Sequence, residues 1–290
     1  MADQASRTRI VEHCSAQGSW RMEFLTPSER LAPFVDRFNA YSERDTGFAR
    51  RREPPSGLAT LVFNLGQELR VEHPVRTLTA YRAGAAFYTG LSSVYAVTET
   101  DRAQEGAQVM LTPLGARRLL GFPLGEVGDR LIDPVDLFGP AARETIERLQ
   151  EAHSQGRRLA ILEQEMERRL GRSCRPLPRD LVWAMQRLRA SAGRVGIAAL
   201  AAELGCSRKH LTMRFSHEFG MAPKLFARVL RFDLALRGLR ESQAVRWAEL
   251  AAACGYADQA HLSRDFSAFA SAPPAAFLRR GLPDGGGFVD

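Results

Sequence analysis

The chain has 290 residues, of which 45% are hydrophobic and 25% are charged, a composition typical of a globular protein with about two domains. The first residues are charged and no long apolar run occurs, so neither a secretory signal nor a membrane-spanning helix is expected. The four cysteines lie far apart and form no C-x-x-C pair, which argues against disulfides or a four-cysteine zinc site and favours a cytoplasmic chain with reduced thiols.

The formal net charge of +7 is unevenly distributed. Residues 1–172 contain 23 basic and 23 acidic side chains, whereas residues 173–290 contain 17 and 10. A neutral half joined to a basic half predicts that the C-terminal half meets a polyanion.

The N-terminal half begins with β-rich composition and becomes helical after Pro113. We expect Leu65 to Val71 to pair back through Gly66 as a hairpin. The expected strands lie at 57–64, 92–100 and 108–112, and the expected helices at 114–120, 140–153 and 157–170.

The chain is predicted to have an α+β organisation with two domains. Residues 1–170 form a β-rich sensor or oligomerisation domain with trailing helices, and residues 171–180, which contain two prolines, form a linker. Residues 181–281 form an all-α domain, and residues 282–290 form a flexible tail.

An internal repeat occupies the C-terminal half. Leu200-Ala201-Ala202 and Gly205 recur fifty residues later as Leu250-Ala251-Ala252 and Gly255, and beyond the glycine the offset becomes 51. Apolar residues at helical spacing stand before and after each glycine, which predicts a helix, a tight turn and a second helix in each copy. The residues that match at offset 51 are His210, Leu211, Phe215, Pro223 and Phe226 with His261, Leu262, Phe266, Pro274 and Phe277.

Ser207 and Asp258 are expected to cap the second helix of each copy. Residues 222–241 are expected to form one connecting helix with Pro223 in its first turn. Such a helix spans ~27 Å, so with the flanking units the two second helices approach the ~34 Å between successive major-groove faces of B-DNA. One chain is therefore predicted to read two adjacent grooves.

In a helix-turn-helix the outer face of the second helix enters the major groove, where an arginine can pair with guanine and a glutamine with adenine. For a single helix, charged residues that simply face water are the alternative; the repeat and the charge distribution favour DNA binding. The candidate DNA-binding residues are Ser207, Arg208, Lys209, Thr212, Met213, Gln259, Ala260, Ser263 and Arg264.

The stretches 200–215, 220–223 and 250–266, with Arg231, Ala235 and Pro274 to Arg280, resemble the AraC/XylS family of bacterial transcription regulators over about residues 180–280. The resemblance implies two helix-turn-helix units on a linker helix, base-facing positions among the candidates above, and double-stranded promoter DNA and RNA polymerase as partners. Met213 stands where an arginine is expected, so the first unit is predicted to discriminate less by hydrogen bonding.

Residues 109–123, followed by Asp129-Arg130 and Asp136-Leu137, resemble a domain found ahead of such DNA-binding regions. Family members often have a small, cupin-like β-barrel there, which implies a small-molecule effector, and helices that form a homodimer. The helices within 140–170 form a dimer face or pack on their own barrel. The aromatic residues that either line a pocket or fill the core are Phe63, Phe87, Tyr88 and Tyr95.

Catalytic motifs are not found. His217-Glu218 begins an H-E-x-x-H pattern, but Met221 takes the place of the second histidine, and no glycine loop is followed by GK[ST]. The sequence therefore predicts a DNA-binding transcription regulator that is not an enzyme and needs no cofactor or metal. The alternative is an N-terminal enzyme or protein-interaction module that the C-terminal domain tethers to DNA; effector, operator, and activation or repression stay open.

Overall fold

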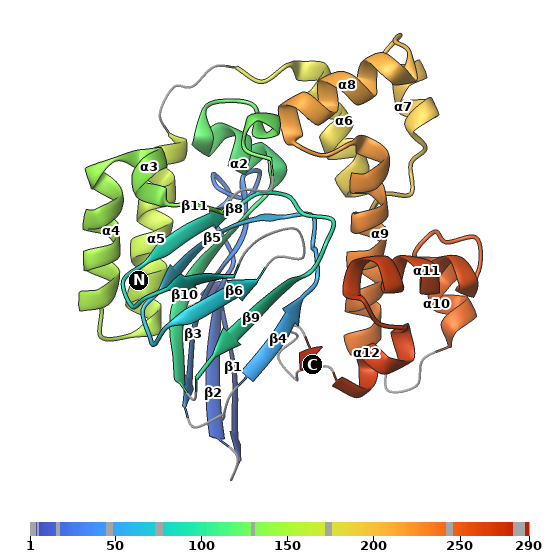
Figure 1. Ribbon diagram of the computed structural model, residues 1–290. Coiled ribbons are helices and arrows are strands. Elements are labelled where there is room, and N and C mark those ends of the chain that lie inside the picture. The colour runs from blue at the N-terminus through green and yellow to red at the C-terminus, as the bar shows by residue number, and fades with distance from the viewer. Residues whose placement is uncertain are drawn as a thin grey trace.

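A computed structural model describes residues 4, 6–15, 18–44, 49–72, 78–101, 103–128, 131–171, 176–241, 246–280 and 288–289 (Figure 1). Two β-sheets form the centre of the N-terminal domain, and the C-terminal helices lie along one side of them. Among the described residues, no helix is both long and apolar enough to cross a membrane.

The larger sheet has seven antiparallel strands, and its centre is the most strongly buried part of the domain. Val109 pairs with Phe38 on one side and with Leu61 on the other, and none of the three is more than 2% exposed. Residues directly opposite each other on neighbouring strands point to the same face of the sheet, so these three side chains lie together in the core that the sheet forms with the helices. The order across the sheet is β1 (Thr8–Ser15), β2 (Gly18–Leu25), β3 (Val35–Arg44), β10 (Ala103–Leu111), β5 (Ala59–Asn64), β8 (Ala86–Thr89) and β11 (Leu131–Ile132).

The smaller sheet has five strands and packs Leu69 and Val71 against Val62 and Phe87 of the larger one. In the described part of the chain no strand pairing joins the two sheets, so the β-rich domain that we predicted is built from two open sheets. The order across the smaller sheet is β12 (Phe288–Val289), β4 (Ala49–Glu53), β9 (Ala96–Thr100), β6 (Leu69–Glu72) and β7 (Thr79–Tyr81).

The hairpin expected for Leu65 to Val71 is wrong, because β6 pairs with β7 and β9 and not with β5. The chain changes sheets at Leu65 and Gly66, whose amides both donate to the carbonyl of Glu105 at 2.8 Å. Gly66 lies so close to β10 that a Cβ atom there would come within 2.4 Å of the backbone nitrogen of Glu105. This close approach directs the chain across the domain instead of back along β5.

The helices after β10 begin with capping residues or prolines, as helix starts commonly do. The Thr112 hydroxyl accepts a hydrogen bond from the amide of Gly115, and Pro113 stands in the first turn. The last of these helices buries Leu159, Leu162 and Met166 and packs on β3, β10 and β2, so its apolar face covers its own sheet. The helices are α2 (Pro113–Leu120), the 3-10 turn η1 (Leu124–Glu126), α3 (Pro134–Phe138), α4 (Pro140–Glu151) and α5 (Gln155–Leu170).

The C-terminal domain is entirely helical up to Arg280. Its first helix starts at Arg179, inside the segment expected to be a linker, and residues 172–175 of that segment lie outside the described residues. Phe288–Val289, expected to belong to a flexible tail, instead pair with Arg52 and Arg51 of β4. The helices are α6 (Arg179–Ala190), α7 (Ile197–Glu203), α8 (Arg208–Phe219), α9 (Pro223–Glu241), α10 (Trp247–Ala253), α11 (Gln259–Ala270) and α12 (Pro274–Arg280).

One hydrophobic core runs through both domains, from the large sheet and its helices to α6, α8 and α9. At the junction α2 and η1 lie against α8 (Figure 1). The Arg117 Nε on α2 donates to the Glu218 carboxylate on α8 at 2.6 Å, and these residues are only 2% and 7% exposed. The N-terminal domain therefore holds one end of α8 directly.

Candidate nucleic-acid interface

The first helix-turn-helix unit consists of α7 and α8 and is built by local signals. Gly205 ends the turn after α7 at a φ of +62°, a conformation that suits glycine. The Ser207 hydroxyl then accepts a hydrogen bond from the amide of His210 at 3.1 Å, which caps α8 as predicted. Leu200 of α7 and Leu211 of α8 are both buried, so the opposite face of α8 is directed outward.

The second unit repeats this construction with α10 and α11. Gly255 has a φ of +77°, and the Asp258 carboxylate accepts a hydrogen bond from the amide of His261 at 2.7 Å. Leu262 and Phe266 are completely buried on the inner face of α11. Because both units use the same turn and cap, α8 and α11 are the equivalent second helices at opposite ends of α9 (Figure 1).

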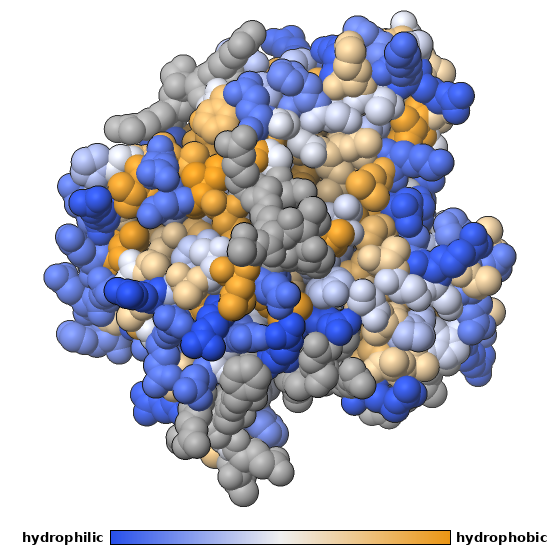
Figure 2. All heavy atoms as spheres, viewed as in Figure 1, coloured by the Kyte–Doolittle hydropathy of each residue, from blue (hydrophilic) through white to orange (hydrophobic). Residues whose placement is uncertain are grey.

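The candidate DNA-binding residues occupy the outer faces of these two helices. Only Thr212 and Ser263 are half-buried, and the other candidates are exposed. Figure 2 shows many hydrophilic residues along the right-hand border of the molecule, on the side of the C-terminal helices. The exposed candidates are Ser207, Arg208, Lys209, Met213, Gln259, Ala260 and Arg264.

Each of the two second helices contains one acidic residue, and in both cases it is buried. Glu218 of α8 is paired with Arg117, and Asp265 of α11 accepts hydrogen bonds from Arg228 of α9 at 2.6 and 3.2 Å. The outer faces of α8 and α11 therefore present no carboxylate to a polyanion. This arrangement favours the attraction of phosphate groups.

The two units hold their second helices by ion pairs of opposite polarity. In the first unit Arg214 of α8 pairs with Asp180 of α6, and in the second Asp265 of α11 pairs with Arg228 of α9. Arg214 and Asp265 stand at equivalent positions of the repeat, at the offset of 51. The hydrogen bond from Arg214 lowers the pKa of the Asp180 carboxyl. Both units therefore contain an ion pair at the equivalent position of the second helix, with the basic and acidic residues exchanged.

Arg231 of the linker helix α9 contacts both units. Its guanidinium donates to the carbonyl of Gly193 at 2.7 Å, in the turn that precedes α7, and lies 5.6 Å from the ring centre of Tyr256 in the second unit. Burial raises the pKa of Tyr256, whose ring also meets His261 edge-on at 5.1 Å. Arg231 thus connects the turns that position α8 and α11.

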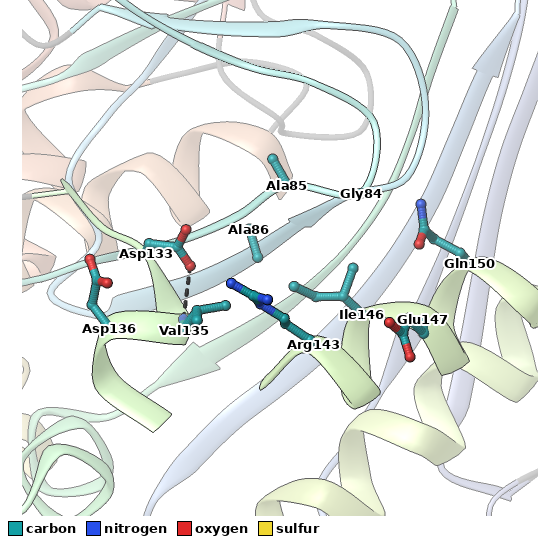
Figure 3. Close-up of a pocket in the computed structure, with 10 residues that line it drawn as sticks. All are labelled: Gly84, Ala85, Ala86, Asp133, Val135, Asp136, Arg143, Ile146, Glu147 and Gln150. Carbon is teal, nitrogen blue, oxygen red and sulfur yellow. Dashed lines mark hydrogen bonds between the residues drawn. The ribbon is translucent and has the colours of Figure 1, made fainter. Parts of the chain in front are cut away.

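A separate cavity of about 380 Å³ lies in the N-terminal domain, between the turn before β8 and helices α3 and α4 (Figure 3). Ala86, Val135 and Ile146 supply apolar walls. The side chain of Arg143 points toward Asp133 (Figure 3). The Asp133 carboxylate accepts a hydrogen bond from the amide of Val135 at 2.8 Å. The other lining residues are Gly84, Ala85, Asp136, Glu147 and Gln150.

The sequence did not indicate this cavity, because its walls come from a turn and two helices that are about fifty residues apart. Of the four aromatic residues expected either to line a pocket or to fill the core, Phe63, Phe87 and Tyr88 are at most 5% exposed and fill the core. The ring of Tyr95 lies 5.0 Å from the guanidinium of Arg52. Asp129 and Arg130 lie outside the described residues. Within the described ranges, no three His, Cys, Asp or Glu side chains are grouped as metal ligands.

Comparisons with known proteins match two separate segments of the chain. Residues 200–280 match the family described as a helix-turn-helix domain, and residues 23–133 match a domain of unknown function, DUF6597. No curated protein matches the chain.

Three solved structures are similar to this chain at low sequence identity. ToxT from Vibrio cholerae is 11% identical, with a TM-score of 0.48 over 83% of this chain and 97% of ToxT. The AraC-like transcriptional activator CuxR is 13% identical, with a TM-score of 0.32 over 77% of this chain and 85% of CuxR. The xylose-binding transcription activator XylR is 18% identical, with a TM-score of 0.30 over 43% of this chain and 38% of XylR.

The family match covers both units of the repeat, and the structure shows each unit as two helices joined by a capped tight turn. The match confirms the resemblance on which the sequence prediction depended, and it points to a transcription regulator. The C-terminal domain of this chain belongs to the AraC-type helix-turn-helix domains, the DNA-binding domains of transcription regulators.

Proposed function

We propose that this protein regulates transcription by binding a specific promoter sequence through both helix-turn-helix units of one chain. The observation that carries the proposal is the pair of outward faces on α8 and α11, which hold cationic and polar side chains while both carboxylates are buried. α9 has 19 residues and therefore extends ~28 Å, so the units at its ends suit successive major-groove faces of B-DNA.

Selection of bound fragments from a genomic library, followed by gel-shift measurements with the full chain, tests this proposal. We expect one preferred sequence with two half-sites, and an affinity that falls linearly on logarithmic axes as salt increases, because bound phosphates release counterions. Arg148→Ala, on exposed α4 of the N-terminal domain, is the control and should bind like the unchanged chain. A failure to enrich any sequence, or an affinity independent of salt, would contradict the proposal.

We further propose that a small-molecule effector controls the DNA-binding domain from the N-terminal domain, and that the cavity beside Arg143 is its site. Its volume of about 380 Å³ falls in the usual range for ligand pockets, and it combines apolar walls with a few charged groups. A thermal-shift screen of metabolites on the full chain should find a compound that stabilises the protein. Arg143→Ala should abolish that shift and Arg148→Ala should retain it; equal shifts in both variants would place the site elsewhere.

We also propose that the protein acts in the cytoplasm, contacts RNA polymerase and forms a homodimer. The apolar face of α5 is used against its own sheet, so a dimer of this chain would have to use other surfaces. Sedimentation of the full chain at several concentrations, with and without the selected DNA, measures whether a second copy joins the complex.

A further inference from the structure

Met213 is a large apolar side chain that the fold leaves in water. It is 62% exposed, more than any other large hydrophobic residue in the described part of the chain. Burying apolar surface lowers the free energy, so an exposed methionine on a functional face gains from an apolar partner. The described residues leave most of this side chain uncovered.

The position of Met213 on α8 limits what that partner can be. It follows Lys209 by four residues, so it lies on the same outward face of α8 as this exposed polar side chain. Further along the helix η1 approaches the backbone, since a Cβ atom on Gly125 would come within 2.7 Å of the carbonyl oxygen of His217. Met213 therefore lies where the uncovered N-terminal part of α8 ends and the part that η1 approaches begins.

The chemistry of the major groove offers one apolar group, the C5-methyl of thymine, among hydrogen-bond donors and acceptors. Methionine has no donor and only a weakly accepting sulfur, so it cannot replace the paired hydrogen bonds of an arginine. Its flexible thioether can adapt to a methyl group. In the second unit the corresponding outward face carries Gln259 and Arg264, which suit hydrogen-bond readout.

We propose that Met213 reads a thymine methyl group, so that the first unit selects thymine by apolar contact and the second unit selects its bases by hydrogen bonds. This inference rests on the proposed function, because it places α8 in the major groove. It goes beyond that function by assigning one base to one half-site, and it makes the operator chemically asymmetric.

The test uses the full chain and double-stranded DNA selected from a random library. In the selected sequence each thymine is replaced in turn by uracil, which removes the methyl group and keeps the base pair. We expect one such replacement in the first half-site to weaken binding about fourfold, as the loss of one buried methyl group requires. In Met213→Gln the same replacement should change affinity less than 1.5-fold, whereas Met213→Leu should remain sensitive.

Leu78→Gln is the matched control, because Leu78 is 52% exposed and lies in the N-terminal domain. It should keep the full response to uracil. If Met213→Gln selects the same bases and retains the same response to uracil as the unchanged chain, the inference is overturned while the proposed DNA binding stands. The same result is expected if Met213 contacts a protein partner and not DNA. If no sequence is selected at all, the proposed function and the inference fail together.

Discussion

Arg264 and Asp265 are neighbours in the chain but have opposite environments. Asp265 is 2% exposed and paired with Arg228, whereas Arg264 is exposed and its Nε donates to the carbonyl of Ala260, one turn back on its own helix, at 3.3 Å. Consecutive helical residues point in different directions, so one helix can anchor itself with the aspartate and present the arginine. The hydrogen bond thus orients the Arg264 side chain through Nε, and the exposed guanidinium can contact a base.

Arg264→Ala is expected to weaken binding to the selected DNA by ~1–3 kcal/mol, because a bidentate contact to guanine would be lost. Binding to unrelated DNA of the same length should change less. Competition gel shifts with both DNAs measure the difference, and Arg148→Ala controls for the loss of one positive charge. An equal loss on both DNAs would show that Arg264 contacts phosphate rather than a base.

Helix α9 sets the separation of the two units, and Arg231 is the side chain that connects it to both. The Gly193 turn lies tightly against α9, since a Cβ atom on Gly193 would come within 2.1 Å of the carbonyl oxygen of Ala227. Arg231 donates to that same turn and faces the Tyr256 ring of the second unit. The relative orientation of α8 and α11 therefore depends on this one guanidinium as well as on the helix.

Arg231→Ala is expected to relax the spacing that the protein requires between its two half-sites, and to reduce stability by ~1–2 kcal/mol through the lost hydrogen bond and ring contact. The measurement is the affinity for selected DNA with one base pair inserted between the half-sites, relative to the original. This ratio should be closer to one in Arg231→Ala than in the unchanged chain. Arg237→Ala, which removes a partly exposed ion pair with Asp233 on the same helix, should not change this ratio.

At the scale of the whole molecule, the buried pair of Arg117 and Glu218 joins the N-terminal domain to the first helix-turn-helix unit. The hydrophobic core is continuous across this junction, and Gly220 at the end of α8 lies against Leu124 of η1. The two domains are therefore expected to unfold as one cooperative unit.

Arg117→Leu is expected to destabilise the protein by ~3–5 kcal/mol, because Glu218 would remain as an unpaired buried charge. The double variant Arg117→Leu/Glu218→Leu should regain most of this loss, since two apolar side chains then occupy the site. Urea unfolding, followed by tryptophan fluorescence and circular dichroism, measures both. A small effect of the single substitution would mean that the carboxylate reaches water and that the junction opens easily.

The elements differ in how far the sequence predicted them. Helix ends in the C-terminal domain were predicted at Ser207, Gly205 and Asp258, because capping and turn formation depend on a few adjacent residues. Strands β1 to β4 were not predicted, and β3 shows why: the polar residues Asn39 and Glu43 are buried there among apolar neighbours. Such a strand lacks the regular alternation of polar and apolar residues that reveals strands.

The repeat, the cap residues and the outward faces of α8 and α11 follow from contacts within a few turns of helix, so the sequence alone predicted which side chains of these helices face outward. The change of sheets at Gly66, the burial of Glu218 against Arg117 and the cavity beside Arg143 depend on segments forty to a hundred residues apart. Helical periodicity carries no information about such distant partners, since packing selects them only after the elements have formed. The tertiary structure therefore decided how the two domains meet, and with it which part of α8 stays open to DNA.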